Sequence, residues 1–264
     1  MYQPDSPASP LKVLPTMYDL PSENPEEPGV PDTFHVFQPR LLDDTFSPSN
    51  YPPERIFTGS DVNLYYDSNN TLWYKRPDWY AVLGVPRLYQ ERDLRLSYVV
   101  WDEKVTPFIV VELLSPGTEK EDLGRTLRDA KSPPTKWEVY EQILKIPYYA
   151  IFDRYSQMFQ PFKLEEGGYK AIKVGDSERF WLPEIQLGLG IWEGEYDGIE
   201  HRWLRWYDAE GWVLTPMERE RKRAESERQR AEQQQQLAES ERQRAERLIA
   251  QLRALGIEPD GENG

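Results

Sequence analysis

Two acidic residues in strand-like segments are the side chains of this sequence best placed to do chemistry. Glu112 interrupts the apolar run Phe108–Leu114, and a short run rich in β-branched residues is typical of a buried central strand. Asp78, in the segment 75–80, precedes a second hydrophobic segment. Burying an ionised carboxylate costs several kcal/mol unless it is hydrogen-bonded, paired or bound to a metal. Two strand-borne acids are the minimum for a divalent-metal site.

The scarcity of cysteine and histidine excludes several other kinds of site. The 264 residues include no cysteine and two histidines, His35 and His201. A disulfide, a thiolate zinc site and a cysteine nucleophile are therefore excluded. A histidine-rich metal site or a Ser-His-Asp triad is not expected from two histidines.

The charge of the chain is strongly acidic. The net charge is −14, and residues 1–217 alone carry −13, from 22 basic and 35 acidic residues. This balance argues against an electrostatic nucleic-acid binder, because neutralising phosphates requires clustered Lys and Arg. Any activity on nucleic acid must therefore use a local basic patch or metal ions.

Hydropathy predicts a soluble cytoplasmic protein with no membrane partner. The first 20 residues lack a basic start followed by an apolar core, so no signal peptide is visible. No run of about 18 apolar residues occurs, so no membrane-spanning helix is expected.

Composition divides the chain into four parts. Residues 1–53 hold 12 of the 23 prolines and predict an extended arm with little regular structure. Residues 54–213 predict a globular α/β domain. Residues 214–256 predict a helical segment, and residues 257–264 a flexible tail.

Hydrophobic segments in the globular part predict a mixed sheet. Residues 63–67 and 72–75, separated by Ser-Asn-Asn-Thr, predict two strands joined by a turn. A helix is predicted near 135–145, between strands at 108–114 and 148–153, so these two strands are joined by a crossover connection. Further strands are predicted near 96–101, 157–164, 169–174, 187–193 and 200–207.

The start of the predicted helix has two candidate signals. Thr135-Lys-Trp-Glu138 fits a capping box, in which the Thr and Glu side chains satisfy free backbone N–H groups reciprocally. Ser132-Pro-Pro, just before it, is also typical of a helix start. If Thr135 is the N-cap, Lys136 is the first helical residue, where the helix dipole disfavours a cation. That position favours a role for Lys136 other than helix stability.

The C-terminal segment contains a long internal repeat. Ala224-Glu-Ser-Glu-Arg-Gln-Arg-Ala-Glu232 recurs unchanged at Ala238–Glu246, fourteen residues or two heptads later. The pattern predicts one helix over 216–255, ended by Gly256. An alanine-rich seam improves toward Leu252 and Leu255, which slightly favours a coiled-coil pair over a single solvated helix.

Several short motifs follow one another in order along the globular part. They are Arg76-Pro-Asp-Trp, Val110-Val-Glu-Leu-Leu-Ser-Pro-Gly-Thr118, Glu121-Asp-Leu-Gly124, Lys136-Trp-Glu-Val-Tyr140, and Ile146-Pro-Tyr-Tyr149 with Phe152-Asp153. This ordered set, over roughly residues 50–210, resembles the restriction endonuclease family known as the Uma-two group, which is assigned to the PD-(D/E)xK nuclease superfamily. The resemblance implies a restriction-endonuclease-like α/β core with a mixed sheet, here carrying the Pro-rich arm and the long coiled-coil-like helix.

The resemblance also implies a catalytic set. Asp78 and Glu112 would hold Mg²⁺ or Mn²⁺. The superfamily's usual Glu-x-Lys pattern would place a catalytic lysine at position 114, where this chain has Leu114. The resembled family tends to carry its lysine on the following helix, as Lys-x-x-x-Tyr, and Lys136 with Tyr140 matches. Residues spaced i,i+4 lie on one helix face.

Two further residues stay open in this set. About ten residues, 126–135, are inserted relative to the shorter family pattern, which makes Lys131 a rival of Lys136. Asp122 is a possible supporting residue that contacts the metal or orients the lysine, or else a helix-start residue.

The leading hypothesis is a Mg²⁺-dependent endodeoxyribonuclease that acts on DNA, with homo-oligomerisation through the C-terminal helix. The main alternative is a catalytically degraded nuclease fold that serves as a coiled-coil interaction module, favoured by the acidity, the missing Glu-x-Lys lysine and the insertion. A third is a metal-dependent hydrolase of another phosphate ester.

Overall fold

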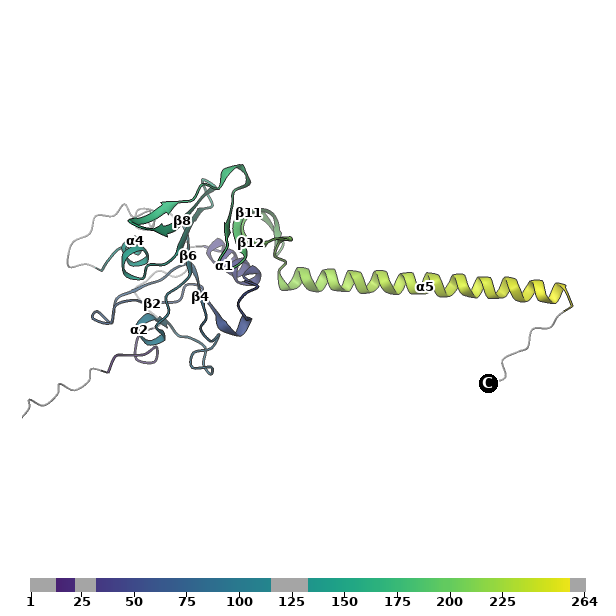
Figure 1. The fold of residues 1–264 in the computed structure, drawn as a ribbon, viewed down its shortest axis with the longest axis horizontal. Coiled ribbons are helices and arrows are strands. Elements are labelled where there is room, and N and C mark those ends of the chain that lie inside the picture. The colour runs from purple at the N-terminus through teal and green to yellow at the C-terminus, as the bar shows by residue number, and fades with distance from the viewer. Residues whose placement is uncertain (1–12, 22–31, 115–132, 257–264) are drawn as a thin grey trace, which may run out of the picture. The chain divides into compact units, whose positions relative to one another are not determined.

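The computed structural model describes residues 13–21, 32–114 and 133–256 (Figure 1). The chain divides into two compact units, Met1–Val213 and Leu214–Gly264. The first unit is a mixed α/β fold with several sheets, and the described part of the second contains a long helix. No helix among the described residues is long and apolar enough to cross a membrane.

A six-stranded sheet forms the centre of the first unit. The strand order is β1-β4-β6-β7-β8-β9. Neighbouring strands are antiparallel except for β6 and β7, which are parallel and joined by the predicted crossover. The strands are β1 (Ile56–Gly59), β4 (Trp79–Leu83), β6 (Ile109–Leu113), β7 (Tyr148–Asp153), β8 (Met158–Glu165) and β9 (Gly168–Ala171).

Two smaller sheets accompany it. The predicted strand–turn–strand is confirmed as β2 (Leu64–Tyr65) paired with β3 (Tyr74–Lys75). The strand predicted at 96–101 is shorter, because β5 (Tyr98–Val99) turns directly into α2 (Val100–Glu103). The other small sheet consists of the antiparallel strands β10 (Arg179–Leu182), β11 (Leu187–Tyr196), β12 (Ile199–Asp208) and β13 (Gly211–Trp212). Two short 3-10 turns are η1 (Pro53–Arg55) and η3 (Gly175–Ser177).

Helix α1 (Phe34–Thr45) corrects the expectation of little regular structure over residues 1–53. Proline content, averaged over that whole region, hides the helical spacing of Phe34, Leu41 and Leu42. All three side chains are buried in the core, and their burial stabilises the helix. Pro39, inside the helix, removes one backbone hydrogen bond, which this burial offsets.

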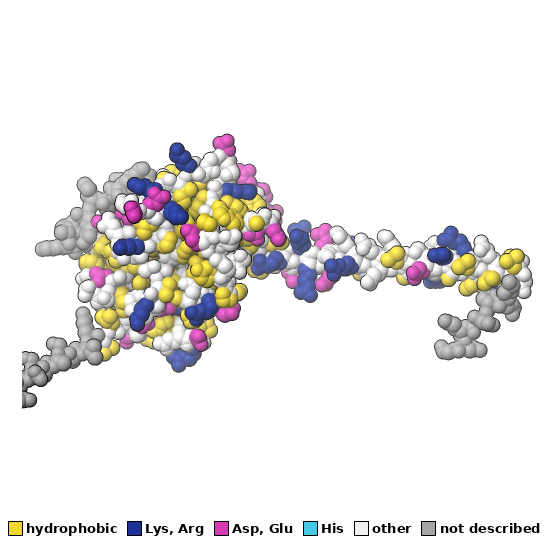
Figure 2. All heavy atoms as spheres, viewed as in Figure 1, with side chains coloured by type: hydrophobic (Ala, Val, Ile, Leu, Met, Phe, Trp, Pro, Cys, Tyr) yellow, Lys and Arg dark blue, Asp and Glu magenta, His cyan; other side chains and the backbone are white. Residues whose placement is uncertain are grey.

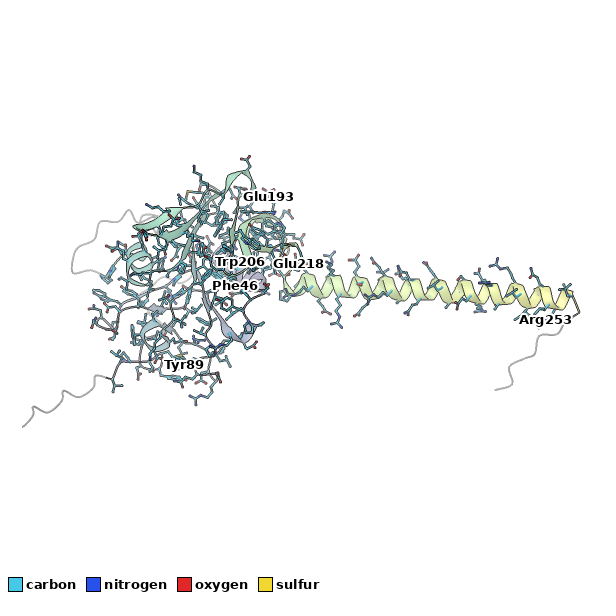
Figure 3. The ribbon with its side chains drawn as sticks, viewed as in Figure 1. Phe46, Tyr89, Glu193, Trp206, Glu218 and Arg253 are labelled. Atoms are coloured by element: carbon cyan, nitrogen blue, oxygen red, sulfur yellow. The ribbon has the colours of Figure 1, made fainter. Side chains whose placement is uncertain are left out.

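Each face of the central sheet carries its own hydrophobic core. One core joins the sheet to α1 and to the sheet of β10–β13, and it includes Trp79, Val111 and Leu113. Phe46 and Trp206 meet within it, with ring centroids 4.9 Å apart (Figure 3). The second core covers the opposite face with Tyr98 of the β2–β5 sheet and with Tyr140. The central strand β6 is therefore buried on both sides.

The crossover helix begins as the sequence predicts but continues in a wider form. α4 (Lys136–Glu138) has Thr135 as its N-cap, and the complete capping box with Glu138 is present. A π-helical turn, η2 (Val139–Ile143), follows directly. The expected 135–145 helix is thus one short α turn and one π turn. Single π turns of this kind occur frequently at functional sites.

The second unit contains α5 (Pro216–Ala254), which confirms the predicted long C-terminal helix. Thr215 and Glu218 form a capping box at its start, and Pro216 occupies the first helical position. Figure 2 shows acidic and basic side chains interspersed along the helix. Three Arg–Glu ion pairs on the helix are spaced i,i+4: Arg223–Glu227, Arg228–Glu232 and Arg242–Glu246.

Candidate active site

The pairing of β4 with β6 brings the two predicted acids to one face of the sheet. Trp79 pairs with Val111, and both side chains enter the core that contains α1. Side chains alternate along a strand, and directly paired residues point to the same side. Asp78, one residue before Trp79, and Glu112, one residue after Val111, come next in this antiparallel register and therefore face the opposite side together.

Backbone hydrogen bonds lock the two acids to each other's strands. The backbone N–H of Leu113 donates to Asp78 Oδ2 at 2.6 Å. The backbone N–H of Asp78 lies 3.4 Å from Glu112 Oε2. The Asp78 carboxylate is thus held by the peptide N–H of the residue after Glu112, and the Glu112 carboxylate by the peptide N–H of Asp78. The pairing of β4 with β6 thus positions Asp78, just before β4, against Glu112.

Glu112 is a fully buried carboxylate with a cation and a phenol as partners. Its exposed fraction is 0%. The Lys136 ammonium donates to Oε2 at 2.9 Å, and the Tyr140 hydroxyl donates to Oε1 at 2.8 Å. The Lys136 side chain remains 17% exposed, so the lysine end of the ion pair is accessible to solvent. Such partners compensate the loss of hydration that burial imposes on a carboxylate.

The crossover helix positions both partners of Glu112. The capping box makes Lys136 the first helical residue, where the helix dipole disfavours a cation. The ion pair with Glu112 compensates that penalty. Tyr140 lies in the π turn that follows and is itself fully buried. The Lys-x-x-x-Tyr spacing therefore delivers one donor to each oxygen of the same carboxylate.

Comparison with known families identifies the family of this chain. The sequence model of Uma2, described as "Putative restriction endonuclease", matches residues 14–193. The chain belongs to the Uma2 family. The match begins well before the motifs, so it includes α1, and it ends within β11. No curated protein matches the sequence.

In this Uma2 family member, the structure unites four of the predicted site residues: Asp78, Glu112, Lys136 and Tyr140. Leu114, at the usual lysine position, is buried in the second core, and its N–H donates to the carbonyl of Phe152. It therefore serves packing and strand pairing. The remaining candidates, Asp122 and Lys131, lie outside the described residues.

The donor chemistry of the site fits a hydrated magnesium ion. Magnesium prefers oxygen ligands and keeps several waters, so two carboxylates are a sufficient protein contribution. Within residues 13–21, 32–114 and 133–256, no set of three or more His, Asp or Glu side chains is grouped as a metal site. Among the residues that the structure describes, Asp78 and Glu112 are the acids brought together at this site.

Sequence reasoning missed one residue that reaches the site strand. His35, on α1, has a side chain that is 3% exposed, and its Nε2 lies 3.1 Å from the carbonyl oxygen of Leu113. The region around it was expected to be an extended arm, so no motif pointed to it. The helical spacing of Phe34, Leu41 and Leu42 is the signal that would have placed His35 on a packed helix.

Proposed function

We propose that this Uma2 protein is a metal-dependent DNA endonuclease that hydrolyses phosphodiester bonds. The observation that carries the proposal is the fully buried Glu112, held by Lys136 and Tyr140 beside Asp78 on one face of β6. A buried ion pair is poor evidence for a stability role, because its desolvation commonly exceeds its Coulombic gain. Buried charges with specific partners concentrate at functional sites.

Asp78 and Glu112 are the residues that would hold Mg²⁺ or Mn²⁺. A metal there supplies polarisation of the phosphoryl oxygen and a lowered pKa for the attacking water. The two carboxylates and the Lys136 ammonium together carry one net negative charge, which favours binding of a dication. Residues 1–217 carry a net charge of −13, so they repel the phosphates of DNA. A bound dication offsets part of this repulsion at the site.

Lys136 and Tyr140 have separable roles in this proposal. Lys136 is the partly exposed donor of the pair, and we assign it the contact with the phosphate. It stabilises negative charge that develops on the phosphoryl oxygens. Tyr140 is fully buried and holds Glu112 Oε1 in place without reaching solvent. Lysine thus serves the reaction, and tyrosine serves the geometry of the carboxylate.

The test is a nicking assay on supercoiled plasmid with Mg²⁺ or Mn²⁺. Wild-type protein is expected to nick the plasmid, and Asp78→Asn and Glu112→Gln are expected to lose orders of magnitude in rate. Glu165→Gln, at an exposed position of β8, is the matched control and is expected to cleave normally. Thermal unfolding shows whether each variant is folded. Equal nicking by all four proteins indicates a contaminant and contradicts the proposal.

A second proposal concerns α5, which we infer associates with another copy of itself. The helix has no buried residue in its own unit. Large apolar side chains are nevertheless exposed on its C-terminal half: Leu237, Leu248, Ile249 and Leu255. Burying them against a second helix removes apolar surface from water, while the alanine seam before them contributes little. The expected association is therefore weak.

Light scattering on the full-length protein tests this second proposal. Leu248→Glu with Ile249→Glu is expected to lower the average mass, because it places charge in the apolar contact. Gln233→Glu with Gln236→Glu adds the same charge away from that contact and is expected to leave the mass unchanged. A monomeric wild type, or equal masses in all three proteins, contradicts self-association through α5.

A further inference from the structure

Helix α1 makes a polar contact with the site strand through its histidine. His35 Nε2 lies 3.1 Å from the carbonyl oxygen of Leu113, and Nδ1 lies 3.0 Å from Asp32 Oδ1. The carbonyl oxygen of Leu113 can only accept a hydrogen bond, so His35 Nε2 is the donor of this contact. The contact is buried, whereas the side chains of α1 beside it make mainly apolar contacts.

Asp32 fixes the orientation of this ring. Its Oδ1 accepts from the backbone N–H of Phe34 at 2.9 Å, which caps the start of α1. Its Oδ2 pairs with the Arg154 guanidinium at 2.7 Å, just after β7. Burial alone would raise the pKa of Asp32, but the hydrogen bonds from His35 and the positive charges of His35 and Arg154 hold it below its usual value. An ionised Asp32 therefore connects α1 to the ends of the two parallel strands.

Leu113 lies between this histidine and the candidate site. Its carbonyl faces His35, while its N–H donates to Asp78 Oδ2. Without the histidine, the Leu113 carbonyl would lose its donor in a buried place, which is costly enough to move the strand end. A shift of Leu113 moves the group that holds Asp78. The chain of contacts runs from His35 through one residue to a site carboxylate.

We propose that His35 is a positioning residue that fixes Leu113 and, through it, the Asp78 carboxylate. The inference rests on the proposed function in so far as Asp78 serves DNA cleavage. Its structural part, the dependence of the Leu113–Asp78 hydrogen bond on His35, stands separately. His35 itself touches neither Asp78 nor Glu112 by any hydrogen bond in the described residues, so its effect acts through the backbone.

Two substitutions at position 35 and one control on the same helix separate positioning from packing. His35→Leu removes the donor, whereas His35→Gln retains an N–H near the position of Nε2. Gln38→Leu is the matched control, because Gln38 is also fully buried on α1 but hydrogen-bonds to Leu204 of β12. It removes hydrogen bonds from the same helix without involving the site strand.

Hydrogen exchange of the Leu113 amide, followed by NMR on leucine-labelled full-length protein, is the first measurement. We expect His35→Leu to speed that exchange by about tenfold or more, the loss of roughly one hydrogen bond. His35→Gln and Gln38→Leu should leave it near the wild-type rate. Equal rates in His35→Leu and wild type, or equal acceleration in His35→Gln and His35→Leu, would overturn the inference.

Plasmid nicking is the second measurement. In His35→Leu, kcat should fall by about tenfold or more with KM little changed, since a small misplacement of a site group is costly. His35→Gln should restore most of kcat, and Gln38→Leu should keep it. Wild-type protein that fails to nick DNA contradicts the proposed function alone, because the exchange rates still decide the role of His35. Cleavage by His35→Leu at the wild-type kcat contradicts positioning.

Discussion

Two acid–base pairs, one at β6 and one that joins the residue after β7 to the start of α1, differ in burial. On the site face, Glu112 and Lys136 lie 2.9 Å apart with side-chain exposures of 0% and 17%. On the α1 face, Asp32 and Arg154 lie 2.7 Å apart with exposures of 26% and 25%. The two ion pairs thus have similar distances, but Glu112 is fully buried, whereas both members of the other pair are partly exposed to solvent.

The difference shows which pair needs an explanation beyond stability. A partly exposed pair is cheap to form and contributes up to about 1 kcal/mol. A fully buried carboxylate is expensive to dehydrate, and apolar residues in its place are often neutral or stabilising. Asp32 and Arg154 therefore suit a structural connection. Glu112 and Lys136 suit a site in which the charge itself is used.

Breaking the buried pair should have the largest effect. Lys136→Met leaves Glu112 buried without its cation, and we expect a loss of about 3–5 kcal/mol in the free energy of unfolding. Cleavage should be lost as well. The double variant Glu112→Gln with Lys136→Met should recover most of the stability but none of the cleavage. Chemical denaturation and plasmid nicking measure the two quantities.

The partly exposed pair, Asp32 and Arg154, provides the matched control for that prediction. Arg154→Met should cost about 1 kcal/mol or less, because its partner Asp32 stays partly hydrated. A stability loss for Arg154→Met as large as that for Lys136→Met would show that burial does not distinguish the two pairs.

A core substitution on the α1 face should affect stability and leave the chemistry alone. Leu42 is fully buried there, and Leu42→Ala should cost about 2–5 kcal/mol through lost transfer energy and a cavity. Cleavage per folded molecule should stay at the wild-type level when measured well below the unfolding temperature. A parallel loss of rate would mean that the two faces are not separable.

Removing the phenol from Glu112 should have a smaller effect. Tyr140→Phe leaves Oε1 without this buried donor, at a cost of about 1–3 kcal/mol. Tyr169→Phe is a matched control, because its hydroxyl also sits in the second core and donates to the carbonyl of Ile146. Both variants should lose stability to a comparable extent. Only Tyr140→Phe should slow cleavage, and equal rates in the two variants contradict a role for Tyr140 in holding Glu112.

The smallest expected effect is the pH dependence of the α1 cap. Asp32→Asn should cost about 0.3–1 kcal/mol at neutral pH, because a negative charge at a helix N-terminus is lost. The pKa of Asp32 is lowered in the folded protein, so its contribution is present above the ordinary Asp value and is lost as the pH falls through the lowered one. Urea unfolding at pH 7 and below pH 4 should show the difference between wild type and variant shrinking. A difference that grows on acidification contradicts this sign.

Local signals in the sequence, together with the family resemblance, predicted which side chains lie around Glu112. The capping box at Thr135 and the Lys136-x-x-x-Tyr140 spacing were readable because both lie within one turn of helix. The strand β6 was readable from its apolar run, and alternation then put Glu112 on a defined face. The register between β4 and β6, which opposes Asp78 to Glu112, depends on long-range pairing that no local pattern encodes.

The contact between α1 and β6 is a second feature that depends on long-range packing and was not predicted from the sequence. His35 approaches Leu113 across 78 positions of sequence, so only the packing of α1 reveals the contact. The four-residue strands β1 and β10 were also not predicted from the sequence. Elements with internal periodicity, such as α5, were predicted to within a residue.

Manganese binding, followed by electron paramagnetic resonance, tests the central claim most directly because it does not depend on the DNA sequence offered. The account predicts that wild-type protein binds Mn²⁺ and that Asp78→Asn and Glu112→Gln each weaken the affinity by more than about tenfold, the loss that even an outer-shell substitution can cause. Glu165→Gln should bind as wild type does. Equal affinity in all four proteins, or no binding by wild type, would contradict a metal-dependent site at Asp78 and Glu112.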